Sequence, residues 1–400
     1  MSVMMISRLL ILALLNLIGY AVVKRLWPAF SRGWRAWTYA GLVALSFLAW
    51  GLPLVLGLGL RGQIPVIGVP LKLFSTMWMV AVLIVVLFGT PFVLVRWWKL
   101  RRATASAAGP VAGGVDLERR GVLMNMGRAV PVVAVGTSSA GVVLGSSGFV
   151  VRKLEVRLKD LPDALDGFRI GQITDIHVGP FITTQDLRAA VEAMNAAEVH
   201  LQVMTGDLID DVEQVDGTME ALAACKAPHG MLAILGNHEY WRGVEPILEG
   251  YESLAKRAPV RLLVDESHVI EHGGERLRVV GVDYPMARRN PFLRAEQMRS
   301  SAEKAFGGTS PGEVVLCLTH HPSFFPLAAE RGAHLTLAGH THGGQVAFFG
   351  FPLFWFVFDY MLGRYKLKDR HLYVSGGTGH WLPFRIGIPP EVSILTLRKA

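Results

Sequence analysis

Five short apolar stretches in the C-terminal two thirds of the chain are each followed by side chains that can bind a metal ion. The stretches have the length of buried β-strands and cover residues 168–174, 201–205, 231–235, 314–319 and 335–338. Stretches compatible with helices, at 184–197 and 212–225, lie between the early ones. This alternation predicts an α/β fold, in which functional side chains gather at the C-terminal ends of the strands.

The residues that follow the five stretches form one consistent set of metal donors. In chain order they read Asp175-Ile176-His177, Gly206-Asp207, Gly236-Asn237-His238-Glu239, His320-His321-Pro322 and Gly339-His340-Thr341-His342-Gly343-Gly344. Each block alone is a weak signal, because an isolated histidine is more often structural than a ligand. Five such blocks, each at the end of an apolar stretch, indicate a shared site. Carboxylates mixed with imidazoles suit two-metal phosphoester hydrolysis, with ions about 3.5–4 Å apart.

The five blocks resemble the D-x-H, G-D, G-N-H-D/E, H and G-H-x-H signature of the calcineurin-like metallophosphoesterases. The resemblance covers about residues 168–397. It implies a four-layer α/β/β/α sandwich with the site at one edge, and hydrolysis of phosphoester bonds. It also implies two divalent metal ions as cofactors. We expect Mn, Fe, Zn or Ni, because these metals accept imidazole together with carboxylate ligands.

The resemblance also implies a role for each residue of the blocks. The ligands of the first ion would be Asp175, His177, Asp207 and His342. The ligands of the second would be Asp207, Asn237, His320 and His340, with Asp207 bridging. His238 would be a catalytic residue, either the acid or a stabiliser of the transition state, rather than a ligand. Asp210 would be a supporting carboxylate. We prefer His320 to His321 because Pro322 sets the register of a His-x-Pro pattern.

A closer resemblance is to the bacterial branch of this family that carries N-terminal membrane segments. Residues 339–345 read Gly-His-Thr-His-Gly-Gly-Gln, and residues 373–377, Arg385 and Pro390-Glu391 resemble the tail of that branch. His380 and Trp381 are bulkier than the pattern leads us to expect, which leaves the local specificity open. No substrate-binding residue is identified.

The N-terminal third of the chain has the composition of a membrane region. The whole chain is 51% hydrophobic and only 18% charged, against about 25% charged in soluble proteins. Apolar stretches at 5–23, 37–58 and 74–97 have the roughly 20 residues needed to span a bilayer. A fourth, at 129–149, is rich in small residues and is either a fourth span or a linker. We therefore expect about four transmembrane helices in 1–149 and a phosphoesterase domain in 150–400.

The charge distribution predicts the orientation of these spans. Residues 1–149 hold 14 Lys and Arg but only two acids, whereas residues 150–400 hold 26 against 30. Placing the first and third connecting segments in the cytoplasm puts 11 of the positive charges inside. We therefore expect a multi-pass protein of the bacterial inner membrane with an extracytoplasmic catalytic domain. The slightly acidic domain also argues against nucleic acid as a partner.

The segment 348–358 bears on the substrate, because seven of its eleven residues are aromatic. It is either a buried strand or helix lying across the sandwich, or an exposed surface for membrane lipids or an acyl or prenyl chain. The second alternative favours a lipid-linked phosphoester or pyrophosphate, and the resembling proteins include enzymes that cleave UDP-2,3-diacylglucosamine. The competing hypotheses are a tethered phosphodiesterase or phosphatase for soluble substrates, and a non-catalytic membrane receptor or assembly protein.

Overall fold

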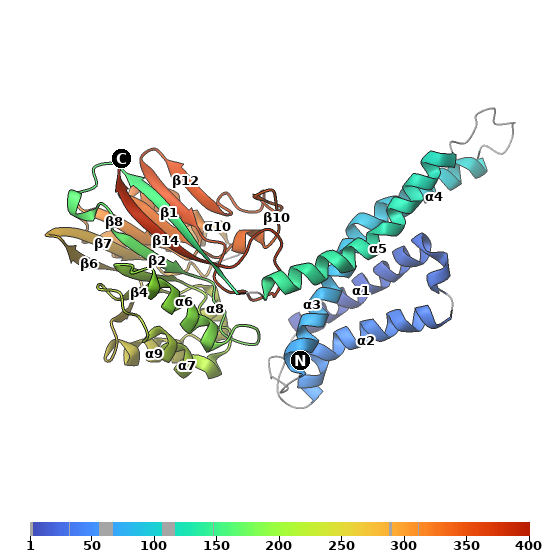
Figure 1. Ribbon diagram of the computed structural model, residues 1–400, viewed down its shortest axis with the longest axis horizontal. Helices are drawn as coiled ribbons and strands as arrows, with labels where there is room; N and C mark the ends of the chain where they lie inside the picture. The colour runs from blue at the N-terminus through green and yellow to red at the C-terminus, as the bar shows by residue number, and fades with distance from the viewer. Residues whose placement is uncertain are drawn as a thin grey trace. The chain divides into compact units, whose positions relative to one another are not determined.

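The structure is a computed structural model, and it divides into two compact units, Met1–Leu144 and Gly145–Ala400. It describes residues 3–31, 33–55, 67–105, 117–146, 148–287, 290–310 and 312–400. Figure 1 traces the helices and strands of both units.

The N-terminal unit is entirely helical in its described part. Its helices are α1 (Val3–Leu26), η1 (Pro28–Ser31), α2 (Trp34–Val55), α3 (Gly68–Ile84), a π-helical turn η2 (Val85–Gly89), α4 (Thr90–Ala105) and α5 (Leu117–Gly145). Side-chain hydrogen bonds join three of them, since the Trp78 indole and the Tyr39 hydroxyl donate to Asn16, at 2.9 and 3.0 Å. The buried Ala134 and Ser138 allow α5 to pack closely on its neighbours.

All four predicted spans lie in helices, except for the last few residues of 129–149. Residues 56–58 of the second span are outside the described residues. The fourth is helical up to Gly145, which disfavours the linker alternative. Among the described residues, two helical stretches are long and apolar enough to cross a membrane, Gly68–Trp98 and Gly121–Gly145.

The α/β unit contains two mixed six-stranded sheets. The first has the order β1 (Val150–Leu158), β14 (Glu391–Lys399), β2 (Arg169–Ile173), β3 (Leu201–Thr205), β4 (Met231–Ile234) and β5 (Val260–Leu262). The second has the order β12 (Gly363–Leu367), β13 (Arg370–Val374), β9 (Leu335–Ala338), β8 (Val314–Leu318), β7 (Glu275–Gly281) and β6 (Glu266–His272). A small hairpin pairs β10 (Ala347–Phe348) with β11 (Phe351–Pro352).

Helices and short helical turns occupy the connections of this unit. The helices are α6 (Thr184–Ala196), α7 (Val215–Leu222), α8 (Asn237–Arg242), α9 (Glu245–Ala255), α10 (Pro291–Phe306) and α11 (Phe325–Glu330). The turns are η3 (Asp163–Leu165), η4 (Val212–Gln214), η5 (Pro322–Phe324) and η6 (His342–Gly344).

Three apolar clusters hold the layers together. One lies between the two sheets and includes Ile170, Val203 and Leu337. A second lies between the first sheet and α6, α7 and α9, and a third between the second sheet and α10 and α11. The layers therefore follow the order helix, sheet, sheet, helix, and the prediction of an α/β fold is confirmed. Strands β2, β3 and β4 are parallel, as are β7, β8, β9 and β13, so their carboxyl ends reach the same edge of each sheet.

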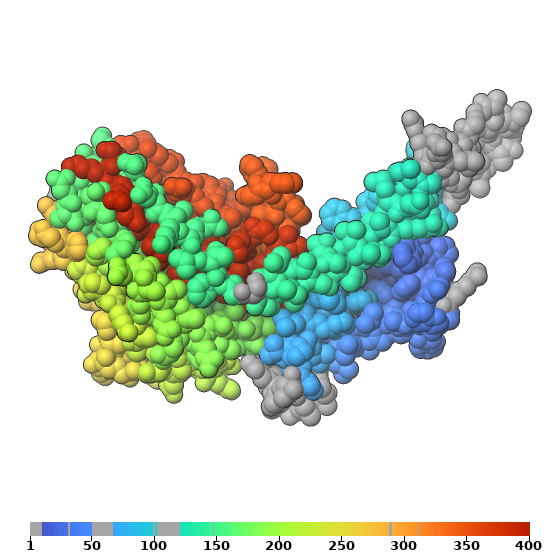
Figure 2. All heavy atoms as spheres, viewed as in Figure 1, coloured from blue at the N-terminus to red at the C-terminus, as the bar shows by residue number. Residues whose placement is uncertain are grey.

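The first strand and the last strand of the α/β unit are neighbours. β1 and β14 pair in parallel along their whole length, and β14 also pairs antiparallel with β2. In Figure 2 the two strands run side by side on the surface, one green and one dark red. The C-terminal strand is thus built into the sheet that carries three of the blocks predicted to bind metal.

Candidate metal centre

The predicted ligands come from loops that follow β2, β3, β4, β8 and β9. Six of the seven are buried, and His340 is partly exposed. Five adopt a left-handed backbone: the φ angles of Asp175, His177, Asp207, His340 and His342 lie between 49° and 72°. Such angles are uncommon outside glycine and cluster at functional sites. They turn the chain sharply where each strand ends.

Two glycines allow these loops to approach one another. A Cβ atom on Gly339 would overlap the carboxylate of Asp175 and the hydroxyl of Thr174. A Cβ atom on Gly206, whose φ is +88°, would lie 2.7 Å from Nδ1 of His320. Any larger residue would therefore push the loops apart.

Three overlapping groups of donors could hold metal ions. Within each group, the donor nitrogen and oxygen atoms lie within 4.8 Å of one another. The groups are Asp175, His177 and His342; His177, Asp207 and His238; and Asp207, His320 and His340. In the first, the Nε2 atoms of His177 and His342 are 3.1 Å apart. In the third, Nδ1 of His340 lies 3.1 Å from Nε2 of His320.

Asp207 lies between these groups. Its Oδ2 atom is 3.2 Å from Nε2 of His320 and 3.8 Å from Nε2 of His177. Burial opposes the charge on Asp207, but the surrounding histidines, His320 first among them, hold its pKa well below the usual value. Conversely, burial disfavours the charged form of His320, yet Asp207 raises its pKa to about 9. A single carboxylate oxygen thus faces imidazoles on two sides.

Asn237 contributes a buried amide to the same region. Its Oδ1 atom has no hydrogen-bond partner among the described residues, which fits a metal ligand better than a structural amide. The neighbouring His238 N–H donates to Oδ1 of Asp207 at 2.8 Å, which fixes this loop against the shared carboxylate. The donors present therefore fit a pair of divalent ions.

His238 is positioned by a second carboxylate, that of Asp210. Nδ1 of His238 lies 2.5 Å from Oδ1 of Asp210, and Nη2 of Arg242 contacts the same oxygen at 3.2 Å. Burial opposes ionisation of Asp210, but hydrogen bonds with His177 and His238 hold its pKa far below the usual range. The Nε2 atom of His238 lies 3.9 Å from Oδ2 of Asp207, so the ring faces the metal-binding groups.

Arg385 lies behind His342, one of the predicted ligands. Its Nη2 donates to Nδ1 of His342 at 3.0 Å, and its Nη1 donates to the carbonyl of Gly376 at 2.6 Å. Burial and then Arg385 hold the pKa of His342 well below its usual value, so the ring is neutral. The neutral form of imidazole is the form that binds a metal ion.

His320 and His321 have different surroundings, and those of His320 support its predicted role. His320 reaches Asp207, whereas Nδ1 of His321 lies 2.8 Å from the hydroxyl of Ser323 and the His321 ring packs 5.8 Å from Phe358. His380, bulkier than expected, is 3% exposed and lies 6.2 Å from the ring of Phe181.

Two residues with clear positions in the structure had no role in the sequence analysis. The Glu239 carboxylate accepts four backbone N–H groups, from Asp207, Leu208, Ile209 and Gly236, and so ties the β3 loop to the β4 loop. The feature of the sequence that could have indicated this role of Glu239 is its place as the acidic last residue of the G-N-H-D/E block. Arg385 was noted only as part of the tail, and the sequence does not indicate its contact with His342.

Comparisons with known proteins find relatives of this chain. Residues 168–344 match the family described as calcineurin-like phosphoesterase. An uncharacterized metallophosphoesterase of Helicobacter pylori is 30% identical over 259 residues, which are 62% of this chain and 66% of that protein. The metallophosphoesterase YkuE of Bacillus subtilis is 28% identical, covering 60% of this chain and 82% of YkuE.

The chain is also similar to a protein that is named as a transmembrane protein. The bovine (Bos taurus) transmembrane protein with metallophosphoesterase domain is 29% identical over 311 residues, 73% of this chain and 66% of that protein. The matched segment, residues 168–344, includes every predicted ligand block. The chain spans just under two thirds of the length of its Helicobacter and bovine relatives. Residues 168–344 of this chain form a calcineurin-like phosphoesterase domain.

Proposed function

We propose that the protein hydrolyses a phosphoester or pyrophosphate bond with two divalent metal ions. Asp175, His177, Asp207 and His342 would hold one ion, and Asp207, Asn237, His320 and His340 the other. The observation that carries this proposal is the position of Asp207, whose Oδ2 atom is approached by His320 at 3.2 Å and by His177 at 3.8 Å. A bridging ligand between two ions needs such a position.

The residues around the ions have separate tasks in this reaction. Two bound ions would polarise the phosphoryl group and lower the pKa of a water molecule. His238 would protonate the departing alkoxide, because Asp210 fixes its Nδ1 and leaves its Nε2 facing the site. Arg242 keeps Asp210 in place from the other side.

Hydrolysis of two chromogenic esters by the full chain in detergent tests the proposal. We expect metal-dependent cleavage of bis-p-nitrophenyl phosphate or p-nitrophenyl phosphate, stimulated by Mn, abolished by chelator and lost in Asp207→Asn. Asp216→Asn, an exposed carboxylate on α7, is the matched control. No activity from folded, metal-loaded protein would favour the receptor or assembly alternative, although retention of all seven ligands and His238 argues against it.

The native metal is a separate part of the proposal. The donors are four imidazoles, two carboxylates and an amide, so we expect Mn, Fe, Zn or Ni rather than Ca or Mg alone. Elemental analysis of protein purified without added metal tests this, and a Mg- or Ca-only content would contradict it.

We further propose that helices α1 to α5 anchor the protein in the bacterial inner membrane as about four spans. Many of their large apolar side chains face outward: Leu17, Trp37 and Phe88 are 67%, 78% and 59% exposed. A water-soluble helical unit would bury such residues. The charge distribution favours an extracytoplasmic catalytic domain. An alkaline phosphatase fusion after residue 149 should be active and one after residue 110 inactive; the reverse pattern would contradict this orientation.

The aromatic segment 348–358 supports a lipid-linked substrate. Of the two alternatives for this segment, its exposure favours a surface over a buried strand or helix. Phe349, Trp355 and Phe356 are 104%, 68% and 69% exposed, and the segment includes the β10–β11 hairpin (Figure 1). The same segment reaches the metal centre, since the Phe358 ring lies 5.8 Å from the ring of His340. An exposed apolar surface next to the reacting groups suits an acyl or prenyl chain.

Substitution of Trp355 and Phe356 with Ser separates this hypothesis from a tethered enzyme for soluble substrates. Turnover of micellar lipid phosphates should fall, while turnover of a small chromogenic ester should be unchanged. Phe292→Ser removes an even more exposed aromatic ring, 86% exposed, from α10 and serves as the control. Equal loss on both substrates would argue against a lipid-binding surface, and no loss on either would favour the soluble substrate.

A further inference from the structure

A second pocket lies at the amino ends of β9 and β13, away from the carboxyl ends that carry the metal-binding loops. Its volume is about 560 Å³, within the range of small-molecule sites. His334, directly before β9, and the β12–β13 turn with Lys368 and Arg370 form one part of its lining. Because β9 and β13 are parallel, with Leu335 opposite His371, Arg370 lies beside His334.

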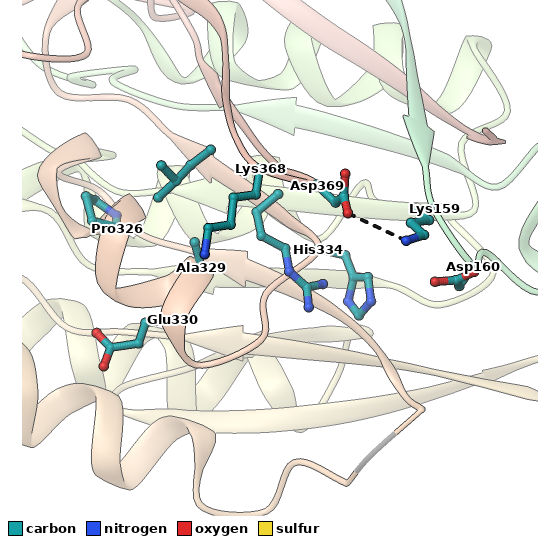
Figure 3. Close-up of a pocket in the computed structure, with 10 residues that line it drawn as sticks. Lys159, Asp160, Pro326, Ala329, Glu330, His334, Lys368 and Asp369 are labelled. Atoms are coloured by element: carbon teal, nitrogen blue, oxygen red, sulfur yellow. Dashed lines mark ion pairs between the residues drawn. The ribbon is translucent and has the colours of Figure 1, made fainter.

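Two of the three cationic side chains that line this pocket have no ionic partner in the described part of the chain. Within the described residues, the side chains of Lys368 and Arg370 form no ion pair or hydrogen bond. Lys159, in contrast, lies 3.8 Å from the carboxylate of Asp369. In Figure 3 this pair lies on one side of the pocket, and the Lys368 amine and the His334 ring extend into it.

His334 adds an N–H donor of fixed direction. The Val315 N–H donates to its Nδ1 at 3.1 Å, so the proton of the neutral ring is on Nε2. Burial and the nearby Arg370 lower the pKa of His334 to about 4, which keeps the ring neutral near pH 7. A guanidinium, an ammonium and an imidazole N–H thus line one pocket, a donor set that matches a phosphate group.

The remaining lining limits what else the ligand can carry. Pro326, Ala329 and Leu367 form an apolar wall. The carboxylate of Asp160, which is close enough to His334 to act on its pKa, and that of Glu330 also line the pocket, so they limit the negative charge that a ligand can carry. A ligand with one phosphate and an adjoining apolar part fits both conditions.

We propose that this pocket is a second, non-catalytic binding site for a phosphate monoester, held by Arg370, Lys368 and His334. The site does not depend on the metal centre or on the proposed hydrolysis. Its phosphate chemistry is shared by free phosphate, soluble phosphate esters and the headgroup of a phosphatidate, and the apolar wall favours the last.

Hydrogen–deuterium exchange of the full chain in phosphatidylcholine nanodiscs tests the site locally. The probes are inorganic phosphate, glycerol 3-phosphate and dihexanoyl phosphatidic acid. We expect each to slow exchange in residues 326–334 and 367–370, with the phosphatidic acid acting at the lowest concentration. Binding at the metal centre would slow exchange in the loops after β2, β3, β4, β8 and β9, so the two sites are distinguishable.

Variants decide whether the cations are responsible. Lys368→Gln with Arg370→Gln should weaken the protection by about tenfold or more, and Arg370→Lys should weaken it less. Lys366→Gln with Arg364→Gln removes the same charge from the exposed side of β12 and should leave it unchanged. Unaltered exchange in β2 and β3 shows that the variants are folded. No protection in this pocket with any probe, or equal protection in all variants, would overturn the proposal.

Discussion

Histidines at the two ends of the strands differ in what they contact. At the carboxyl ends, His320 lies 3.2 Å from Asp207 and His177 lies 3.4 Å from Asp210. At the amino ends, Nδ1 of His200 accepts the Arg169 N–H at 2.9 Å, and Nδ1 of His334 accepts the Val315 N–H at 3.1 Å. The first pair faces carboxylates, and the second pair completes the hydrogen bonding of a neighbouring strand.

The pKa values differ in the same way. Burial opposes protonation in both groups, but nearby carboxylates raise the pKa of His177 and His320 above the usual value. The pKa of His200 and His334 is lowered, first by burial and then by neighbouring cations or histidines. For these four histidines, the position relative to the strand therefore separates a candidate metal ligand from a residue that completes backbone hydrogen bonding, which the residue type cannot do.

The largest expected effect comes from exchanging one histidine at each end. His320→Gln should bind one metal ion instead of two, and its rate of hydrolysis should fall at least ~100-fold. Substitution of residues that only orient a metal ligand already lowers metal affinity or activity by about 10–100-fold. His200→Gln should keep both ions. Metal content by elemental analysis and turnover of the chromogenic esters measure the difference, and equal metal content in the two variants would remove the distinction.

A smaller loss should follow when the carboxylate that orients His238 is changed. Asp210→Asn keeps the shape of the side chain but weakens the contact with Nδ1 of His238. We expect the rate to fall by about 10–100-fold with metal content unchanged. The exposed Asp216→Asn is again the control. A variant that loses metal instead would show that Asp210 supports the ligands rather than the acid.

Glu239→Gln tests how the loops at the carboxyl ends are held together. The glutamine side chain has only one acceptor oxygen, and its NH₂ group would face backbone N–H donors. Several of the four hydrogen bonds that the Glu239 carboxylate accepts from the backbone would therefore be lost. We expect the free energy of unfolding to fall by about 2 kcal/mol, as for hydrogen bonds to a buried charge. Denaturant unfolding against Glu245→Gln, an exposed acid at the start of α9, measures this. Equal stability of the two variants would mean that the loops do not need Glu239.

The smallest expected effect is a pH dependence at the amino ends. With a folded pKa of about 4 against 6.5 when unfolded, His334 binds its proton more readily in the unfolded chain. Stability should therefore fall as the pH drops from about 6.5 to 4, by roughly 1–2 kcal/mol after allowance for partial exposure. His334→Asn, which can still accept the Val315 N–H, should show a flatter dependence. Identical pH profiles would argue against the assignment.

The sequence predicted the strands that carry the ligand blocks closely. Residues 201–205 and 335–338 are the bounds of β3 and β9, because buried parallel strands read as unbroken apolar runs. The prediction that the residues after these strands lie close together followed from their shared position at the strand ends. The ligand roles of those residues stay predictions until metal is measured.

Other features depend on contacts that no local pattern contains. The Arg385 guanidinium meets His342 across 43 residues, and an isolated arginine gives no indication of its partner. The exposure of segment 348–358 depends on what packs around it, and apolar composition alone favours burial as much as a lipid surface. The insertion of β14 between β1 and β2 was likewise not predicted.

The neighbouring position of β1 and β14 has a consequence for the order of folding. Arg152 and Glu391, joined by a 2.6 Å ion pair, are 239 residues apart in the chain. Until the last strand arrives, the edge of β2 has no neighbour on that side, and the sheet stays open. Contacts of such long range form late and slowly. A chain that crosses a membrane in extended form would therefore complete this sheet only after translocation, when the whole domain has reached the far side.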